Sequence, residues 1–409
     1  MEGDRGSDEG VQRAGDAAVS AMQAEPDRAP YSLGQLCGYM LRLGTFGFGG
    51  PVALVGAMHR DLVERERWIT DADYKEGLAL AQLMPGPLAA QLAMYLGYVH
   101  HGVWGATAVG GAFVAPSFAM VVGLGWAYLR FGGLPWMQAV FYGVGAAVIG
   151  IIAVGAVRLT AKNVRRDPLL WAVYGIVAAV TVITKSEAAW VFIAGGLVVW
   201  MWRAPPKFLR GGVRAVAGLE AVIASLGAGT DLPMLLRIAA FFGEAGAFVF
   251  GSGLAIVPFL YGGVVTTNHW LTERQFLDAV AVAMITPGPV VITVGFIGYL
   301  VAGFAGACVA AFATFFPCWL FTIVPAPYFK KYGKRPALIA FVDGVTAAAI
   351  GAISGAVIVL AQRSIVDVAT ASLAVASALV LWRFRKVPEP VIVAAAALVG
   401  LVAYPVLRG

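Results

Sequence analysis

Ionisable side chains are scarce in this chain of 409 residues. Asp, Glu, Lys and Arg make up 13% of the sequence and hydrophobic residues 60%, whereas a soluble domain carries roughly twice that charge. Three long runs, residues 102–129, 132–157 and 296–328, contain no Asp, Glu, Lys, Arg or His. Each is longer than the roughly 20 residues that cross a 30 Å hydrocarbon layer. The scarcity of charge therefore excludes a soluble globular protein and predicts an all-α polytopic membrane protein.

Cysteine and histidine are also rare, which bears on metal and redox chemistry. The three cysteines, Cys37, Cys308 and Cys318, lie in apolar segments without Cys-x-x-Cys spacing, so we interpret them as small packing residues. The four histidines show no spacing typical of metal ligands; they are His59, His100, His101 and His269. We therefore expect neither a metal site nor another cofactor.

Sequence motifs of ATP-driven transport and of hydrolysis are missing as well. No Gly-Lys-Ser/Thr phosphate loop is present, and neither Gly-x-Ser-x-Gly nor His-Glu-x-x-His occurs. No histidine lies within a predicted span. A nucleotide site and an enzyme are thus disfavoured, and an intramembrane hydrolase stays the least favoured alternative.

The net charge of +6 is concentrated in loops between the apolar segments. Lys and Arg collect on the cytoplasmic side of membrane proteins, and short loops offer no surface for nucleic acid. We therefore predict a multi-pass protein of a bacterial inner (plasma) membrane, with the lipid bilayer and not nucleic acid as its surroundings. The basic clusters fall within residues 158–166, 203–214, 330–335 and 383–386.

Punctuation by charge and proline divides the chain into six apolar segments, a polar connection and six more. Residues 1–30 are polar and lack an apolar core, which predicts a mobile tail rather than a signal peptide. The predicted organisation is therefore a tail at 1–30, an N-terminal repeat at 31–203, a cytoplasmic linker at 204–231 and a C-terminal repeat at 232–409.

An internal repeat relates the two halves at an offset of 202 residues. Phe46-Gly47-Phe48-Gly49-Gly50-Pro51 matches residues 248–253, Trp68-Ile69-Thr70-Asp71 matches residues 270–273, and Pro85-Gly86-Pro87 matches Pro287-Gly288-Pro289. At an offset of 201, Pro116 also matches Pro317. Collinear matches at nearly one offset indicate duplication.

The loop charges predict that the two halves have opposite orientations. Basic clusters follow segments four and six in the first half but segments three and five in the second. If all four clusters are cytoplasmic, residues 74–99 and 276–299 must return to the side they came from. Their arms of about 11 residues span roughly 17 Å, so each half is predicted to hold about five spans plus one re-entrant hairpin, in an inverted repeat.

A Pro-Gly-Pro sequence inside an apolar segment has a definite effect on the backbone. The first proline ends a helix, glycine permits the turn, and the second proline can start a new helix. The free N–H groups of that half-helix, at Ala89, Ala90 and Gln91 or at Val291, Ile292 and Thr293, form an anion site. The predicted substrate-binding residues are Arg42, Gly49, Gly50, Gln82, Pro85, Gly86, Pro87, Gln91, Gly251, Gly253, Thr286, Pro287, Gly288 and Pro289.

Charged residues inside apolar segments are costly unless they are used or paired. Arg42 lies just before the Phe-Gly-Phe-Gly-Gly sequence, and its repeat counterpart is Glu244. We expect Arg42 to contact an oxyanion with its planar donor fork, with snorkelling to the membrane surface as the alternative. Glu244, Glu76 and Asp278 are candidates for coupling or pairing, and interfacial positions remain open for the last two.

The same residues resemble a known family. Phe46-Gly47-Phe48-Gly49-Gly50-Pro51, Trp68-Ile69-Thr70 and Gln82-Leu83-Met84-Pro85-Gly86-Pro87 are similar to the chromate ion transporter family. Residues 248–253 and Pro287-Gly288-Pro289 resemble that family's C-terminal half.

The resemblance implies a two-domain chromate efflux protein of the bacterial inner membrane that confers chromate resistance, with halves in opposite orientation. Relatives often have a basic residue where Glu244 stands, so the resemblance supports Arg42 more than Glu244 at the anion.

Chromate suits the predicted site because it is a small tetrahedral dianion. Its outward movement down an inside-negative potential releases about 4.6 kcal/mol per 100 mV, so efflux can be driven by the potential, by ion coupling or by both. A carrier of sulfate or another oxyanion is the alternative, and a homodimer is left open.

Overall fold

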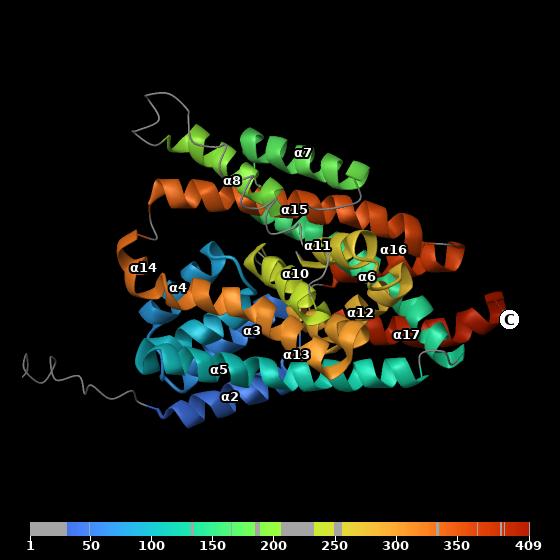
Figure 1. Cartoon of the computed structure of the whole chain (residues 1–409), viewed down its shortest axis with the longest axis horizontal. Helices are drawn as coiled ribbons and strands as arrows, with labels where there is room; N and C mark the ends of the chain where they lie inside the picture. Colours follow the sequence, from blue (N-terminus) through green and yellow to red (C-terminus); the bar gives the residue numbers. More distant parts are fainter. Residues whose placement is uncertain are drawn as a thin grey trace, which may run out of the picture.

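The structure, a computed structural model, is helical throughout the residues that it describes (Figure 1). These are residues 31–48, 50–131, 135–164, 166–184, 189–205, 233–248, 256–332, 335–365, 367–384, 387 and 389–408. The predicted tail at 1–30 and most of the predicted linker at 204–231 lie outside the described residues. The all-α class predicted from the sequence is confirmed for the described part of the chain.

The two halves contain corresponding helices in the same order, and the second half has two additional short ones. In the first half these are α2 (Leu33–Phe46), α3 (Gly50–Met58), a π-helical turn η1 (His59–Arg65), α4 (Asp71–Leu83), α5 (Leu88–Phe131), α6 (Pro135–Asn163), α7 (Pro168–Thr184) and α8 (Ala189–Arg203). The second half contains α10 (Met234–Phe248), α11 (Ile256–Tyr261), η3 (Gly262–Thr267), α12 (Glu273–Ile285), η4 (Val290–Ile292), α13 (Thr293–Ile323), α14 (Ala326–Tyr332), α15 (Pro336–Ser364), α16 (Val368–Arg383) and α17 (Glu389–Arg408).

Repeated threonines start the corresponding helices α4 and α12. The Thr70 hydroxyl accepts a hydrogen bond from the Asp73 N–H at 3.1 Å, and the Thr272 hydroxyl accepts one from the Gln275 N–H at 3.3 Å. Such side-chain caps satisfy the free N–H groups of a first helical turn. The Trp-x-Thr-acid sequence shared by the two halves is therefore a helix-start signal.

Each Pro-Gly-Pro sequence breaks its apolar segment, as predicted. In the first half α4 ends at Leu83 and α5 begins at Leu88, and Gly86 between them has a φ of +145°. The two arms lie side by side, since a Cβ placed on Gly77 would collide with the Tyr95 ring. The chain therefore turns back at Gly86, and in the second half α12 and η4 flank the same break.

A second reversal follows each break. Gly102 has a φ of 59° and ψ of −152° inside α5, and Gly303 has a φ of 61° and ψ of −153° inside α13. Gly97 and Gly105 lie with their backbones in contact, which is impossible along one straight helix. Each helix thus consists of a short and a long arm, and the long arm of α5, residues 103–131, reaches about 43 Å at 1.5 Å per residue.

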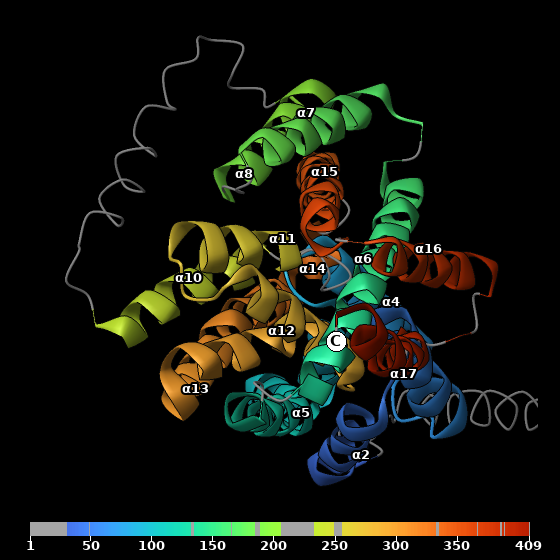
Figure 2. The ribbon, with the colours of Figure 1, turned by 90° about the vertical axis from the view of Figure 1, so that its right-hand side faces the viewer.

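The long arms of α5 and α13 pack side by side and antiparallel (Figures 1 and 2). The Trp319 indole N–H donates to the Thr107 hydroxyl at 3.0 Å near one end of the contact. Towards the other end the Phe118 and Phe304 rings are 6.5 Å apart. Residue numbers rise along one helix as they fall along the other, so corresponding helices of the two halves run in opposite directions where they meet.

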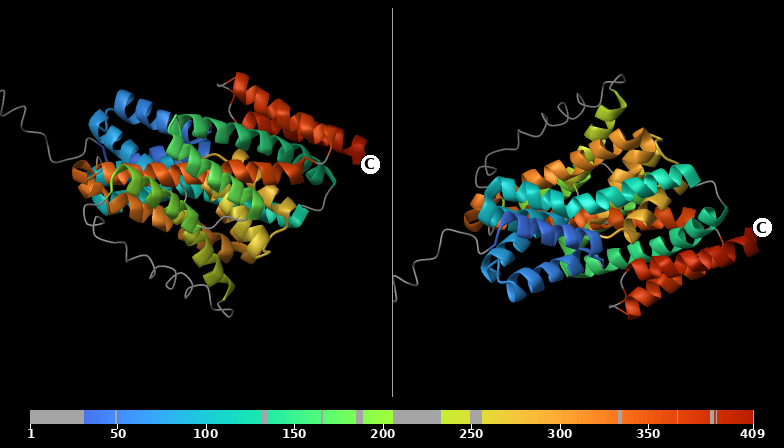
Figure 3. Two further views of the ribbon diagram at one scale, coloured as in Figure 1. Left: turned by 90° about the horizontal axis from the view of Figure 1, so that it is seen from above. Right: turned by 90° about the horizontal axis from the view of Figure 1, so that it is seen from below.

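The last two helices of each half pack against the other half. Helices α7 and α8 cover α15, whereas α16 and α17 cover α6 (Figure 2). Figure 3, which gives the views from above and below, shows the C-terminal helices in red along one side of the bundle. This exchange places the outer helices of each half against a long helix of the other half.

Matched glycines allow that exchange. Gly143 of α6 lies against the backbone of Ala396 and Gly400 in α17, and Gly344 of α15 lies against that of Gly195 and Gly196 in α8. Small residues let membrane helices approach closely. Both glycines occupy the same repeat position, so the close contact with an outer helix of the other half occurs once in each half.

Four helical stretches in the described part of the chain are long and apolar enough to cross a membrane. They come in two repeat-related pairs, Leu88–Phe131 with Val290–Phe329 and Trp136–Asn163 with Pro336–Gln362. Shorter apolar helices complete the bundle, namely Pro168–Thr184, Val191–Arg203, Val368–Arg383 and Glu389–Tyr404. The chain is a multi-pass membrane protein, and the number of ten spans stays a prediction.

Candidate functional site

An unwound segment interrupts the first apolar segment between α2 and α3. Gly47 is extended, with φ −82° and ψ 96°, and its N–H donates to the Leu43 carbonyl at 2.7 Å. A Cβ on Gly47 would collide with that carbonyl and with the Leu54 side chain. Glycine is therefore required at this break.

The second Pro-Gly-Pro turn lies directly against this unwound segment. The Gly288 N–H donates to the Gly47 carbonyl at 3.1 Å. The Ser117 hydroxyl, from the long arm of α5, donates to the Pro287 carbonyl at 2.7 Å and lies 3.4 Å from the Gly44 carbonyl. The hairpin tip of the second half is thus bonded to the unwound segment and to α5 of the first half.

Ser117 and Gly288 fit each other sterically. Gly288 has a φ of +95°, a conformation that L side chains rarely adopt, and a Cβ there would collide with the Ser117 hydroxyl oxygen. Ser117 is fully buried. We did not predict Ser117 from the sequence, although its neighbour Pro116 was one of the repeat matches.

The first Pro-Gly-Pro turn is closed by its own half-helix. The Gln91 side-chain amide donates from Nε2 to the Pro85 carbonyl at 2.6 Å, and this contact packs the side chain over Gly86. The other amide atom, Oε1, is buried and has no hydrogen-bond partner in the described part of the chain. The repeat counterpart, Thr293, is satisfied because its hydroxyl donates to the Val290 carbonyl at 2.7 Å.

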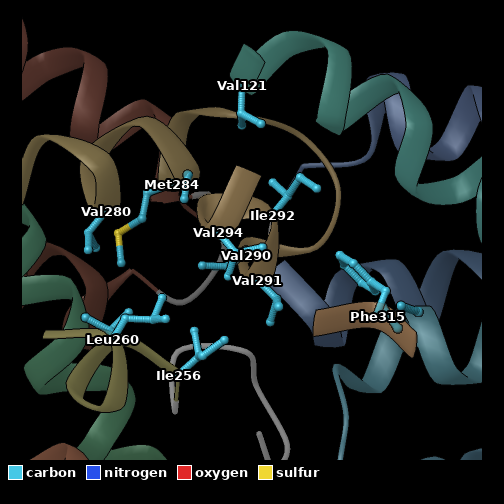
Figure 4. Close-up of a cluster of buried hydrophobic side chains, with 14 of the residues drawn as sticks. Val121, Ile256, Leu260, Val280, Met284, Val290, Val291, Ile292, Val294 and Phe315 are labelled. Atoms are coloured by element: carbon cyan, nitrogen blue, oxygen red, sulfur yellow. The ribbon is translucent and has the colours of Figure 1, made fainter. Parts of the chain in front are cut away.

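Some of the N–H groups predicted to face an anion are bonded within their turns. The Gln91 N–H donates to the Pro87 carbonyl and the Ile292 N–H to the Pro289 carbonyl, both at 3.0 Å. Apolar side chains enclose the second half-helix, where Val290 and Val291 lie with Met284 of α12 (Figure 4). In this state the second helix N-terminus is therefore covered.

A separate apolar groove of about 510 Å³ lies between the long arms of α5 and α13. Its lining includes Thr107 and Phe118 from α5 with Phe312 and Trp319 from α13. None of the predicted site residues lines this groove, and its apolar walls do not suit a dianion.

Arg42 and Glu244 both have exposed side chains. Helix α2 buries Leu36, Met40 and Gly44 on the face that packs against α5, and Arg42 lies off that face. None of the ion pairs found among the described residues joins Arg42 to Glu244. The anion-contact role of Arg42 stays a prediction.

The two carboxyl groups on the hairpins have different surroundings. Asp278 is 4% exposed and accepts a hydrogen bond from the Tyr128 hydroxyl of the first half at 2.7 Å. Glu76 is half-buried and interacts with Tyr95 of its own hairpin. The repeat therefore places a carboxyl beside a tyrosine in both halves but buries only one.

The remaining predicted site residues differ in burial. Gln82 is exposed, whereas Thr286 is buried and its hydroxyl donates to the Val282 carbonyl at 2.7 Å. Gly50 begins α3, and Gly49, Gly251 and Gly253 lie outside the described residues. Among the described residues, no group of three or more His, Cys, Asp or Glu could hold a metal ion.

Two repeated helical halves with paired broken helices form an architecture typical of secondary transporters. The chain belongs to the chromate transporter family, which matches residues 34–200 and again residues 236–401. The family resemblance noted in the sequence is thus confirmed, with one match in each half.

Three relatives are similar over nearly their full lengths. The chromate transport protein of Cupriavidus metallidurans is 71% identical over 92% of this chain and 95% of its own. The probable chromate transport protein of Synechococcus elongatus is 57% identical, over 91% and 96%. The chromate transport protein of Pseudomonas aeruginosa is 32% identical, over 92% and 94%. No solved structure matches this chain.

Proposed function

We propose that this protein exports chromate from the cytoplasm across the inner membrane and thereby confers chromate resistance. The names of the relatives supply the substrate. The direction follows from charge, because an inside-negative potential favours outward movement of a dianion by about 4.6 kcal/mol per 100 mV. The membrane potential, ion coupling or both drive the export.

The two halves form an inverted repeat in the membrane. The antiparallel contact between α5 and α13 supports this arrangement, since Thr107 and Trp319 meet at one end and Phe118 and Phe304 towards the other. The distribution of basic loops supports it independently. Alternating access then comes from movement of one half, with its hairpin, against the other.

The anion binds between the repeats, where the backbone breaks meet. The observation that carries this proposal is the hydrogen bond from Gly288 in the second half to Gly47 in the first. Gly288 N–H and Ser117 O–H are donors in a buried place, and both now donate to carbonyl groups of the protein. A dianion would replace those carbonyls as the acceptor, because hydrogen bonds to charged groups are the stronger ones.

Helix N-termini and Arg42 supply the remaining positive potential. The half-helices that begin after Pro87 and Pro289 carry the positive ends of their dipoles. Arg42 precedes the unwound segment by one turn and contacts the anion with its planar fork once the hairpin tip moves. In the structure, protein carbonyls accept hydrogen bonds from both donors, and the anion would take their place.

Transport of labelled chromate into inverted membrane vesicles tests the function. Export appears as uptake into the vesicle lumen, and with a clamped, lumen-positive potential we expect uptake that unlabelled chromate inhibits. Sulfate and molybdate serve as competitors. If sulfate is transported faster than chromate, the substrate assignment is wrong, and if no oxyanion is taken up, the function is wrong.

Arginine variants test the site within the same assay. We expect Arg42→Ala to abolish uptake and Arg42→Lys to reduce it severalfold, because lysine keeps the charge but loses the bidentate fork. Arg130→Ala, which removes an exposed arginine at the end of α5, is the matched control. Wild-type uptake by Arg42→Ala at equal membrane level would show that Arg42 only anchors the helix at the interface.

A further inference from the structure

Asp278 stands apart from the other ionisable residues of this protein. Among the Asp, Glu, Lys, Arg and His side chains of the described residues, only that of Asp278 is buried, with 4% of its surface exposed. It lies on α12, the arm that leads into the second Pro-Gly-Pro turn. A charged carboxylate at such a place in a membrane protein is costly unless it is paired or functional.

The contacts of Asp278 provide no compensating positive charge. Its hydrogen-bond donor is the Tyr128 hydroxyl at 2.7 Å. The Tyr128 ring in turn meets Phe141 of α6 and Phe296 of α13, with centroids 5.5 and 5.6 Å away. No cation lies within 4.0 Å of the carboxylate among the described residues. In this closed environment the protonated, neutral carboxyl is the favourable form.

The other titratable groups on the helices around α12 do not replace that missing cation. Arg274 acts on Asp278 electrostatically from one turn earlier on the same helix, but it is exposed. The cations of the neighbouring helices, Arg130 of α5 with Arg158 and Lys162 of α6, are also exposed. Glu389 of α17 interacts with Arg158. The tyrosines have other contacts: Tyr261 of α11 donates to Glu273 at 3.2 Å, Tyr142 of α6 to Asp367 at 2.6 Å and Tyr404 of α17 to Gln138 at 3.2 Å, and Tyr299 of α13 lies against Gly125. The short helices η3 and η4 carry no titratable side chain.

We propose that Asp278 is the proton-binding group of this transporter, and that it carries a proton inward in exchange for the exported dianion. This proposal rests on the proposed function. The carboxylate takes a proton from external water when the hairpin arm is exposed to that side, and becomes neutral. The neutral group can then return to the contact with Tyr128, and it releases the proton to cytoplasmic water when the arm opens inward.

The position of Tyr128 links this proton to movement of the halves. Asp278 belongs to the second half and Tyr128 to the first, so their hydrogen bond exists only while the two halves are in this arrangement. The repeat-related pair of Glu76 and Tyr95 lies within one hairpin, and movement between halves does not separate it. Burial and a partner from the opposite half therefore distinguish Asp278 as the coupling site.

Inverted vesicles with independently controlled gradients test the proposal. With the potential clamped by potassium and valinomycin, we expect an acidic lumen to stimulate wild-type chromate uptake severalfold. Asp278→Asn should retain uptake driven by the potential and lose the stimulation by the pH gradient. A lumenal pH dye should report proton loss from the lumen on chromate addition for the wild type and not for Asp278→Asn.

Three further variants make the result decisive. Glu273→Gln makes the same carboxyl-to-amide change on the same helix and should respond to the gradient as the wild type does. Tyr128→Phe should keep the stimulation by the pH gradient but shift its midpoint pH. If Asp278→Asn fails to insert into the membrane, Asp278→Glu should insert and show the stimulation.

Stimulation of Asp278→Asn by the pH gradient would overturn the proposal. So would a wild type that transports chromate without any response to the gradient. A wild type that transports no chromate would instead refute the proposed function.

Discussion

The two Pro-Gly-Pro turns share one sequence but are held in different ways. The turn at Gly86 is closed by Gln91 from its own half-helix, whereas the turn at Gly288 is held by Ser117 and Gly47 from the opposite half. The local closure of the first turn uses no atom of the other half. A bond to the other half makes the position of the second hairpin depend on the arrangement of both halves.

The outer helices show a similar difference in chemistry at matched positions. Arg203 at the end of α8 forms ion pairs with Asp167 and, at 2.7 Å, with Asp343 of α15. At the repeat-related place the Tyr142 hydroxyl donates to Asp367 at 2.6 Å, and its ring lies 5.4 Å from Tyr404. The same exchanged packing is thus secured by ion pairs in one place and by a tyrosine–carboxyl hydrogen bond with a ring contact in the other.

Alanine at the two turn glycines should give the largest difference between the halves. Gly288→Ala forces a side chain into a left-handed conformation and against Ser117, so we expect chromate transport to fall at least tenfold. Gly86→Ala is strained by the φ of +145° as well, but its side chain meets the end of the flexible Gln91 side chain, which can move, and should lose less. Initial uptake rates at equal membrane level measure both.

Gly145→Ala, a glycine of α6 with open space around its Cβ position, is the matched control for these two variants. Equal losses in Gly288→Ala and Gly86→Ala would contradict the claim that the second turn is the one coupled to the opposite half.

Removal of the Ser117 hydroxyl should have an intermediate effect. Ser117→Ala leaves the buried Pro287 carbonyl without its donor, which costs about 1 to 3 kcal/mol, and we expect a lower melting temperature and reduced transport. Its repeat counterpart Cys318 has weak sulfur contacts with Gly246 and Thr314, so Cys318→Ala should change both much less. Thermal unfolding in detergent compares the two, and an equal shift would refute the asymmetry.

Substitutions at the ends of the outer helices should change the melting temperature least. The two repeat-related places should differ chiefly in how that change depends on salt. Arg203→Ala removes partly exposed ion pairs, each worth at most about 1 kcal/mol, and leaves two carboxylates near each other. We expect a loss of a few degrees in melting temperature at low salt. Tyr142→Phe should cause a similar loss that does not depend on salt, because the contact it removes is a hydrogen bond from a hydroxyl group. A salt-independent loss in Arg203→Ala would contradict the assignment.

Much of the fold could be predicted because its signals are local. Helix breaks at Pro85–Pro87 and Pro287–Pro289 follow from the conformations of proline and glycine alone. The matching threonine caps start helices within one turn of their own positions. The long uncharged runs likewise indicate membrane segments where they occur in the chain. Because the two halves are repeats, a feature predicted in one half also predicted its counterpart in the other.

Most of the candidate site's contacts could not be predicted in this way. Ser117 and Gly288 are 171 positions apart in the chain, and nothing local indicates that they touch. Gln91 and Thr293 were both expected near an anion, yet the Gln91 side-chain amide closes its own turn and the Thr293 hydroxyl donates to the Val290 carbonyl just before its helix. Such contacts depend on how the hairpins lie against neighbouring helices.

The membrane environment, the duplication and the places where helices break follow from the amino-acid sequence, because composition and backbone conformation act over short distances. Tertiary packing places the outer helices of each half over α15 or α6 of the other half. It also buries Asp278 beside Tyr128, while Glu76 stays half-buried. Two carboxyl groups at the same repeat position look equivalent in the sequence. Their burial differs because it depends on which helices of the opposite half pack over them.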